Sequence, residues 1–368
     1  MHLRRRRQVT TAGLAVCAIA LAACSSSSSS STTSSSSTSS SSSAPAAASS
    51  SSLSGTLNGS GSTFQTVYQQ TAIQSFRSVQ PNMTVNYGSG GSGKGRTDLA
   101  SGVVNFAGSD SPIPAAEMPT FNGKTVLYFP VFLGPITVSY NLSGVSSLKL
   151  DATVLAEIFG GKITSWNNPA ITALNPDVTL PSTPITIAVR SDSSGTTQNF
   201  SLYLEKAGGS AWALGSSSTI KWPATARAGN GNPGVAQIIK STPGAIGYVD
   251  YADAKASGLT FASIKNSSGS YIAPSPSAAS AAGNGITVAS NLTFHAVDSP
   301  NAQAYPITYQ SWVLVYAMQP NANDAAMLKA YIGYLIGAGQ QLLGNLGYAP
   351  LPSNLQQMAQ AQLSQITS

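Results

Sequence analysis

Three short loops of this chain combine glycine with serine and threonine, at residues 59–64, 88–95 and 190–196. Each lies where a strand-like segment gives way to a helical pattern, so its N–H groups belong to a first helical turn and lack intrahelical partners. Such helix starts carry a partial positive charge and bind anions through N–H and hydroxyl donors. One loop of this kind is weak evidence, because serine and threonine commonly cap helices. Three of them, the third opening with Arg190, favour a binding site for an oxyanion.

The second loop also matches parts of two nucleotide-binding patterns. Its glycines have the spacing of a dinucleotide-binding fingerprint, and Asp110 follows at about the distance that this motif requires. With Lys94 the loop resembles a P-loop, but Gly95 stands where a serine or threonine would reach the metal ion. Dinucleotide cofactors and nucleoside triphosphates are cytosolic, whereas residues 1–23, described below, have the pattern of an N-terminal leader that directs export. We therefore expect no cofactor.

Hydrolytic chemistry lacks its usual side chains. His295 is the only histidine after the N-terminal leader, and no G-x-S-x-G pattern surrounds the loop serines. A metal site built on several histidines is excluded for the same reason. These observations favour a binding protein that is not an enzyme and holds no metal.

The N-terminus has the pattern of an export signal. Arg4–Arg7 precede an apolar stretch at 12–23, which is shorter than the ~20 residues that span a bilayer. The stretch ends in Leu-Ala-Ala-Cys, which resembles a bacterial lipobox and predicts a lipoprotein signal peptide over 1–23, with Cys24 lipidated. An ordinary signal peptide cleaved near an alanine is the alternative. Residues 24–368 contain 14 basic and 12 acidic residues, and this small net charge gives no indication of nucleic-acid binding.

Residues 24–53 are nearly all serine, with a few threonines, alanines and prolines. A segment with so little apolar surface is expected to be disordered. About 30 flexible residues have a mean reach of ~30 Å, so this stretch is predicted to be a tether between a membrane anchor and a folded body.

Residues 54–368 alternate strand-like and helix-like segments, which predicts an α/β fold. Their length exceeds the size at which one core usually stops growing, so two domains are expected. The predicted strands cover 83–87, 103–107, 125–140, 184–189 and 312–317. Within 125–140, breaks are predicted at Pro130 and at Gly134-Pro135. A helix is predicted over 324–336, with Asp324 as its N-cap.

Several stretches, taken in order, resemble the PstS-type phosphate-binding proteins of phosphate ABC importers. The resemblance covers essentially all of 56–360. The stretches are GSGSTF at 59–64, NFAGSD at 105–110, IFGGKITSWNNPAITALNP at 158–176, RSDSSGTT at 190–197, PGAIGYVDYA at 243–252 and GYAPLP at 347–352.

The resemblance implies a set of phosphate ligands. The family's binding residues correspond to Thr63, Phe64, Ser92, Asp110, Arg190, Ser194, Gly195 and Thr196. Asp192 matches an acidic position that holds the arginine in place. Lys94 departs from the family pattern, where glycine is usual, and we expect its side chain to point to solvent.

The residue types suit hydrogenphosphate, an anion that still carries a proton. Hydroxyl and N–H groups donate hydrogen bonds to its oxygens, and the planar guanidinium of Arg190 can donate two parallel hydrogen bonds while neutralising part of the negative charge. Asp110 would repel a dianion unless it accepts that proton, and sulfate has none to give near neutral pH. A binding protein for another oxyanion, such as sulfate or molybdate, and a secreted phosphatase remain the alternatives, as does a surface adhesin.

The same resemblance implies two α/β lobes of the periplasmic-binding-protein-like (type II) fold, with the ligand in the cleft between them. We place lobe I at 54–134 plus 305–368 and lobe II at 135–304, with chain crossings near 130–135 and 304–308. The implied partners are inorganic phosphate, the membrane permease subunits of an ABC importer, and the membrane itself through the anchor on Cys24. A monomer on the extracytoplasmic side is expected.

Overall fold

A mixed β-sheet runs through residues 53–368, which are the residues that the computed structural model describes. The predicted signal peptide, Cys24 and nearly all of the predicted serine-rich tether lie outside the described residues. The strand order is β2-β1-β3-β12-β4-β8-β6-β7, with β9 beside β4. The strands are β1 (Gly55–Gly61), β2 (Met83–Ser89), β3 (Phe106–Ser109), β4 (Val126–Tyr140), β6 (Thr186–Arg190), β7 (Arg227–Gly229), β8 (Ala245–Asp250), β9 (Thr260–Phe261) and β12 (Thr308–Tyr316). A small second sheet joins β5 (Lys149–Leu150), β10 (Ser263–Lys265) and β11 (Tyr271–Ile272).

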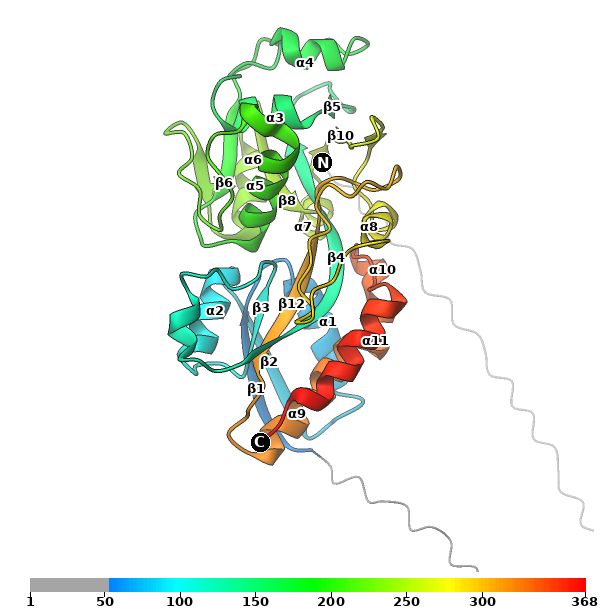
Figure 1. The fold of residues 1–368 in the computed structure, drawn as a ribbon. Helices are drawn as coiled ribbons and strands as arrows, with labels where there is room; N and C mark the ends of the chain where they lie inside the picture. The colour runs from blue at the N-terminus through cyan, green and yellow to red at the C-terminus, as the bar shows by residue number, and fades with distance from the viewer. Residues whose placement is uncertain (1–52) are drawn as a thin grey trace, which may run out of the picture. The chain divides into compact units, whose positions relative to one another are not determined.

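Strand β4 connects the two halves of the main sheet (Figure 1). It pairs antiparallel with β12 as far as Pro135, and with β8 from Ile136 onward. On one side of it β1, β2 and β3 are parallel, and on the other β6, β7 and β8 are parallel. Each half has its own helices, so the two-lobed α/β architecture expected from the sequence is confirmed. The residue limits of the lobes stay a prediction, but the change of partner within β4 falls beside the expected first crossing.

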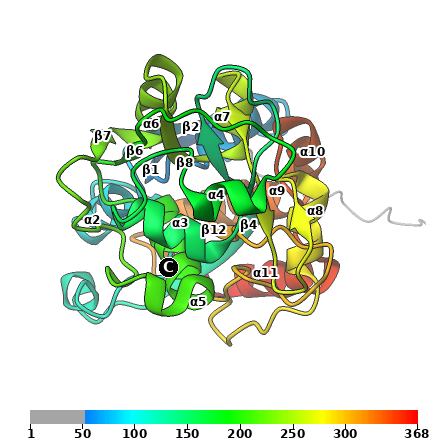
Figure 2. The same ribbon diagram turned by 90° about the horizontal axis from the view of Figure 1, so that it is seen from above.

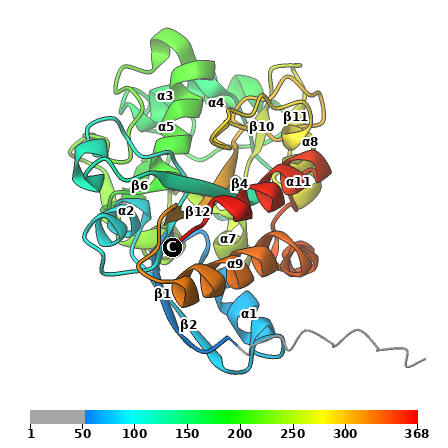
Figure 3. The same cartoon turned by 60° about the horizontal axis from the view of Figure 1, so that its bottom comes forward.

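Helices cover both halves of the sheet. Viewed from above, α5 and α6 lie on opposite sides of β6 and β8 (Figure 2). On the other half, α1 packs on β2 and α9 on β1 (Figure 3). The helices are α1 (Thr66–Phe76), α2 (Ser92–Ala100), α3 (Ala152–Phe159), α4 (Pro169–Leu174), α5 (Gly195–Gly208), α6 (Gly231–Ser241), α7 (Tyr251–Ala256), α8 (Pro276–Gly283), α9 (Ala322–Ile336), α10 (Leu343–Leu346) and α11 (Ser353–Gln362). Short 3-10 turns lie at Met118–Phe121, Gly209–Ala211, Ala338–Leu342 and Leu363–Gln365.

The prolines predicted to interrupt 125–140 do not end the strand. Opposite β12 the register shifts, so that Ser311 faces Phe132 while Trp312 faces Pro130. One extra β4 residue is thus accommodated in a bulge, beside a proline that has no N–H to donate.

Other element boundaries differ from the predicted ones by a few residues. The strand predicted over 103–107 begins only at Phe106, and Val103 is 67% exposed. The predicted cap of the helix at 324–336 is wrong. Asn321 is the N-cap, its side chain accepts from the N–H of Asp324 at 2.9 Å, and Asp324 lies in the first turn.

Buried aromatic side chains fill the core next to the sheet. Phe64 stacks on Tyr309 with ring centroids 4.2 Å apart and meets Phe132 and Tyr348 edge-on. This cluster anchors the loop after β1 against β4 and β12. None of the helices formed by residues 53–368 combines the length and the apolar character needed to cross a membrane.

Candidate anion-binding site

The residues predicted to bind an anion lie at the carboxyl ends of parallel strands and at helix starts. Thr63 follows β1, Asp110 follows β3 and Arg190 ends β6, while Ser92 begins α2 and Ser194 caps α5. Carboxyl ends of parallel strands share one edge of a sheet, where open α/β proteins bind ligands. These five side chains are all buried, and Asp110 is only 1% exposed. The fold thus collects polar groups from both lobes in a place that excludes bulk water.

Asp110 is surrounded by hydroxyl donors. The Ser62 hydroxyl lies 2.7 and 2.6 Å from its two carboxylate oxygens, and the Ser311 hydroxyl lies 2.5 Å from Oδ1. Ser92 Oγ is 3.3 Å from Oδ2 and accepts from the Asp110 N–H at 3.1 Å. Burial raises the pKa of Asp110 to about 6, although the hydroxyls and the charge of Arg190 act in the opposite direction. The charge of Asp110 near neutral pH therefore depends on the serine hydroxyls and on Arg190 around it.

The start of α5 lies directly against Asp110. The Ser194 side chain accepts from the N–H of Thr197 at 3.1 Å, as an N-cap does. Gly195 and Thr196 follow as the first two helical residues, so their N–H groups have no acceptor within the helix. A Cβ on Gly195 would lie 2.5 Å from Ser92 Oγ and 2.6 Å from Asp110 Cβ. Glycine at this position lets the two lobes approach one another.

Arg190 is held by Asp192 through two charge-assisted hydrogen bonds. Its Nε donates to Oδ1 at 2.8 Å and its Nη2 to Oδ2 at 2.5 Å. Burial works against the charges of both groups, yet their pairing raises the pKa of Arg190 and lowers the pKa of Asp192. Nη1 donates instead to Thr196 at 3.3 Å and to Asn232 Oδ1 at 3.2 Å. The contacts with Asp192, Thr196 and Asn232 therefore fix the orientation of the guanidinium.

Asn232 connects the two lobes and was not identified from the sequence. Its amide nitrogen donates to Thr63 Oγ1 at 3.1 Å and to the Asp250 carboxylate, while its oxygen accepts from Arg190. Tyr309 also donates to Asp250, and burial raises the pKa of Asp250 well above its ordinary value. Asn232 thereby orients two predicted ligands at once.

Phe64 differs from the simple expectation, whereas Lys94 has the exposed side chain that was expected. The N–H of Phe64 donates to Ser62 Oγ at 3.1 Å, and its ring belongs to the aromatic cluster rather than to the site. Lys94 is 54% exposed and forms an ion pair with Asp98 at 2.6 Å.

Ser62 and Ser311 were also missed. Ser62 lies within the first glycine-rich loop, where only its neighbours were singled out. Ser311 directly precedes the apolar run at 312–315 in a buried strand, and this position was the available signal.

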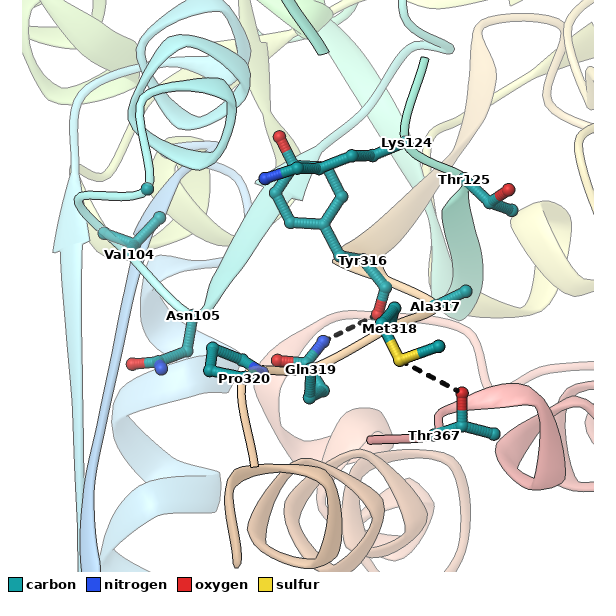
Figure 4. A pocket seen from close by; sticks show the side chains of 11 residues that line it. Val104, Asn105, Lys124, Thr125, Tyr316, Ala317, Met318, Gln319, Pro320 and Thr367 are labelled. Atoms are coloured by element: carbon teal, nitrogen blue, oxygen red, sulfur yellow. Dashed lines mark hydrogen bonds between the residues drawn. The ribbon is translucent and has the colours of Figure 1, made fainter. Parts of the chain in front are cut away.

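Two cavities deserve comparison with this site. One of about 270 Å³ borders Thr63 and is lined further by Thr66, Val67, Asn230 and Asp253, so it flanks the predicted ligands. The other, of about 580 Å³, lies near the start of β3 and the end of β12, away from Asp110 (Figure 4). Its charged lining residue, Lys124, places Nζ 5.0 Å from the ring centroid of Tyr316. The larger cavity is therefore not where the anion-binding groups converge.

The comparisons agree with this architecture. A family profile described as "PBP superfamily domain" matches residues 46–338. Phosphate-binding protein PstS 3 of Mycobacterium tuberculosis is 37% identical over 309 residues, covering 81% of this chain and 83% of the relative. PstS 2 of the same organism is 33% identical over 329 residues, covering 84% and 87%. A solved periplasmic phosphate-binding protein (PfluDING) bound with phosphate has a TM-score of 0.69 at 21% identity, covering 84% of this chain and 94% of its own.

The fold and the buried interlobe site define a periplasmic-binding-protein-like receptor. Within that class, the identity and coverage of the relatives assign the chain more narrowly. It belongs to the PstS-type phosphate-binding proteins.

Proposed function

We propose that the protein is an extracytoplasmic receptor that binds inorganic phosphate and delivers it to an ABC importer. The observation that carries the proposal is the convergence of Arg190, Asp110 and the α5 N-terminus in one buried place between two lobes. Membership of the PstS-type phosphate-binding proteins identifies phosphate as the anion that this site would bind. No metal-ligand cluster of three or more His, Cys, Asp or Glu occurs within residues 53–368.

The proposed ligands divide by chemistry. Arg190 supplies the positive charge, and the hydroxyls of Thr63 and Ser92 supply neutral donors. The N–H groups of Gly195 and Thr196 add the partial charge of a helix start. The remaining proposed contacts are the Ser194 hydroxyl, the Asp110 carboxylate and the Phe64 N–H, whose proton would be shared between the anion and Ser62 Oγ.

Asp110 gives the site its preference for a protonated anion. A carboxylate beside an oxyanion is favourable where the oxyanion donates a proton to it. Hydrogenphosphate has such a proton, and sulfate near neutral pH does not, so bound sulfate would leave a buried acceptor facing another acceptor. This reasoning favours phosphate over the other oxyanions considered.

We further propose that the receptor is a monomer, lipid-anchored through Cys24 on the outer face of the cell membrane, with residues 24–53 as its tether. Closure of the lobes over the ligand would present a ligand-dependent surface to the permease subunits. In this role the protein binds and releases phosphate without chemical change, so it acts as no enzyme.

Calorimetric titration of the full-length protein, freed of bound anion, tests the proposal. Tight phosphate binding with no heat from sulfate is expected, and Asp110→Asn is expected to reduce that preference. Asp177→Asn, which changes an exposed carboxylate, is the matched control. Equal binding of sulfate or molybdate would favour the broader oxyanion receptor, and turnover of a phosphate monoester would favour the phosphatase. Folded protein that binds neither anion would overturn the function.

A further inference from the structure

Two buried serine hydroxyls at Asp110 have their protons directed by other donors. At Ser62, the N–H of Phe64 points at the hydroxyl oxygen from 3.1 Å. A hydroxyl that accepts from an N–H still has one proton to donate. The acceptor within reach of that proton is the Asp110 carboxylate, at 2.6 and 2.7 Å.

The proton of Ser311 is directed by a longer chain of donors. Gln65 Nε2 donates to Ser311 Oγ at 2.7 Å and to the carbonyl oxygen of Trp312 at 2.8 Å. Because a carbonyl only accepts, this second bond fixes which end of the Gln65 amide is the nitrogen. The Gln65 oxygen accepts from Gln69, whose own oxygen accepts from the Tyr331 hydroxyl at 2.6 Å. Ser311 therefore donates its proton to Asp110 Oδ1, at 2.5 Å.

The other ionisable groups around Asp110 do not supply this contact. Arg190 acts on it at longer range and commits Nε and Nη2 to Asp192. Four further ionisable side chains lie close enough for the charge of Asp110 to raise their pKa values beyond the effect of burial, namely Asp250, Tyr87, Tyr309 and Tyr348. Aspartate and tyrosine side chains are never cations, so none of the four offers Asp110 a positive charge. Direct stabilisation of the Asp110 charge thus falls to the serine hydroxyls.

We propose that Ser62 and Ser311 are specificity-determining residues, because their directed protons keep Asp110 ionised and so fit the site to an oxyanion that still carries a proton. This inference rests on the proposed function. Oδ1 receives the proton of Ser311, whereas Oδ2 is contacted by Ser62 at 2.6 Å and by Ser92 at 3.3 Å but not by Ser311, so Oδ2 is the oxygen that we expect to accept the proton of the ligand. A protonated Asp110 would instead donate to the anion, and sulfate would then be accommodated.

The test uses the full-length protein with Ser311→Ala, Ser62→Ala and the double variant. Ser139→Ala is the matched control, because Ser139 is fully buried in β4 and its hydroxyl pairs with Thr137 rather than with Asp110. The first readout is the ionisation of Asp110 without ligand, followed by carboxyl carbon NMR. The midpoint is expected to rise by at least one pH unit in the double variant, a tenfold change in proton affinity.

The second readout is the ratio of phosphate to sulfate affinity between pH 5 and 8. The double variant is expected to lose at least tenfold of its phosphate preference at pH 7, and the wild type to lose preference only as the pH falls towards 6. Ser311→Thr restores a hydroxyl and is expected to restore the wild-type profile. Thermal unfolding establishes that each variant is folded. If Ser311→Ala, which changes strand β12, does not fold, both readouts are taken on Ser62→Ala alone.

An Asp110 midpoint and an anion preference equal to those of Ser139→Ala would overturn the inference. If the wild type binds no phosphate, the proposed function fails instead, and the ligand-free titration of Asp110 still decides whether the serines control its charge.

Discussion

Replacing Asp192 by asparagine removes the charge that holds Arg190, while leaving a side chain of nearly the same shape. The side chains of the pair are 1% and 11% exposed, so solvent screens the loss very little. Breaking a buried pair by removing one partner costs about 3–5 kcal/mol. The asparagine oxygen still accepts one hydrogen bond, from Arg190 or from the N–H of Gly231, so we expect the lower end, about 3 kcal/mol.

Chemical and thermal unfolding of anion-free protein at pH 7 measures this loss. With an unfolding entropy of ~2.1 cal/mol/K per residue over about 315 residues, a change of about 3 kcal/mol corresponds to a melting temperature lower by roughly 4–5 °C. The contacts of Asp192 with Arg190 and with the N–H of Gly231 lower the pKa of Asp192 in the folded state. The contribution of Asp192 to the free energy of unfolding is therefore complete above the unfolded pKa of a carboxyl group. It is lost as the pH falls through the lower folded pKa. The difference between wild type and variant should therefore shrink in strong acid.

Lys94→Gln is the matched control, since the Lys94–Asp98 pair is exposed on its lysine side and such pairs contribute about 0–1 kcal/mol. Added phosphate should recover part of the stability of Asp192→Asn, because the anion supplies a new partner for Arg190. If Asp192→Asn unfolds at the same denaturant concentration as Lys94→Gln, the ion pair does not hold Arg190 and the reasoning fails.

Three further predictions concern residues within or beside the site. Gly195→Ala places a methyl group against Ser92 and should hold the lobes apart, giving a larger radius of gyration in X-ray scattering and weak phosphate binding; an unchanged radius would contradict the closed geometry. Asn232→Ala removes the contacts to Arg190 and Thr63 and should weaken phosphate binding at least tenfold by calorimetry; wild-type affinity would exclude a positioning role. Burial raises the pKa of Asp253 to about 6, so between about pH 4 and pH 6 the folded state holds a proton that the unfolded chain has lost, and above pH 6 the folded state carries a buried negative charge that the unfolded chain exposes to water. Asp253→Asn should therefore stabilise the protein by about 1–2 kcal/mol at pH 7 and should have no such effect at pH 3. Equal stabilisation at the two pH values would show that the pKa of Asp253 is not raised.

The sequence was sufficient for the architecture and for the positions of the three loops that carry the proposed ligands. Glycine and hydroxyl residues before a helical pattern are a local signal, and in the structure they lie at strand ends and helix starts as expected. The continuous strand β4 was harder to foresee. Pro130 predicts a break, and only pairing with β12 through a bulge lets the strand continue.

The missed residues act through contacts that are distant in the chain. Ser311 reaches Asp110 across 201 positions, and Asn232 reaches Thr63 across 169. Neither spacing leaves a pattern in one sequence, because strand pairing and lobe closure create both contacts. The proton directions at Ser62 and Ser311 depend further on Phe64 and Gln65, so they follow from the three-dimensional arrangement alone.

A crystal structure of the protein grown with phosphate tests the central claim most directly. The account predicts one tetrahedral anion enclosed between the lobes, within hydrogen-bonding distance of Arg190, Thr63 and the N–H groups of Gly195 and Thr196. One anion oxygen should lie close enough to Asp110 Oδ2 to share a proton with it. Phosphate bound elsewhere, such as in the cavity beside Tyr316, with the Arg190–Asp110 site unchanged, would contradict the account.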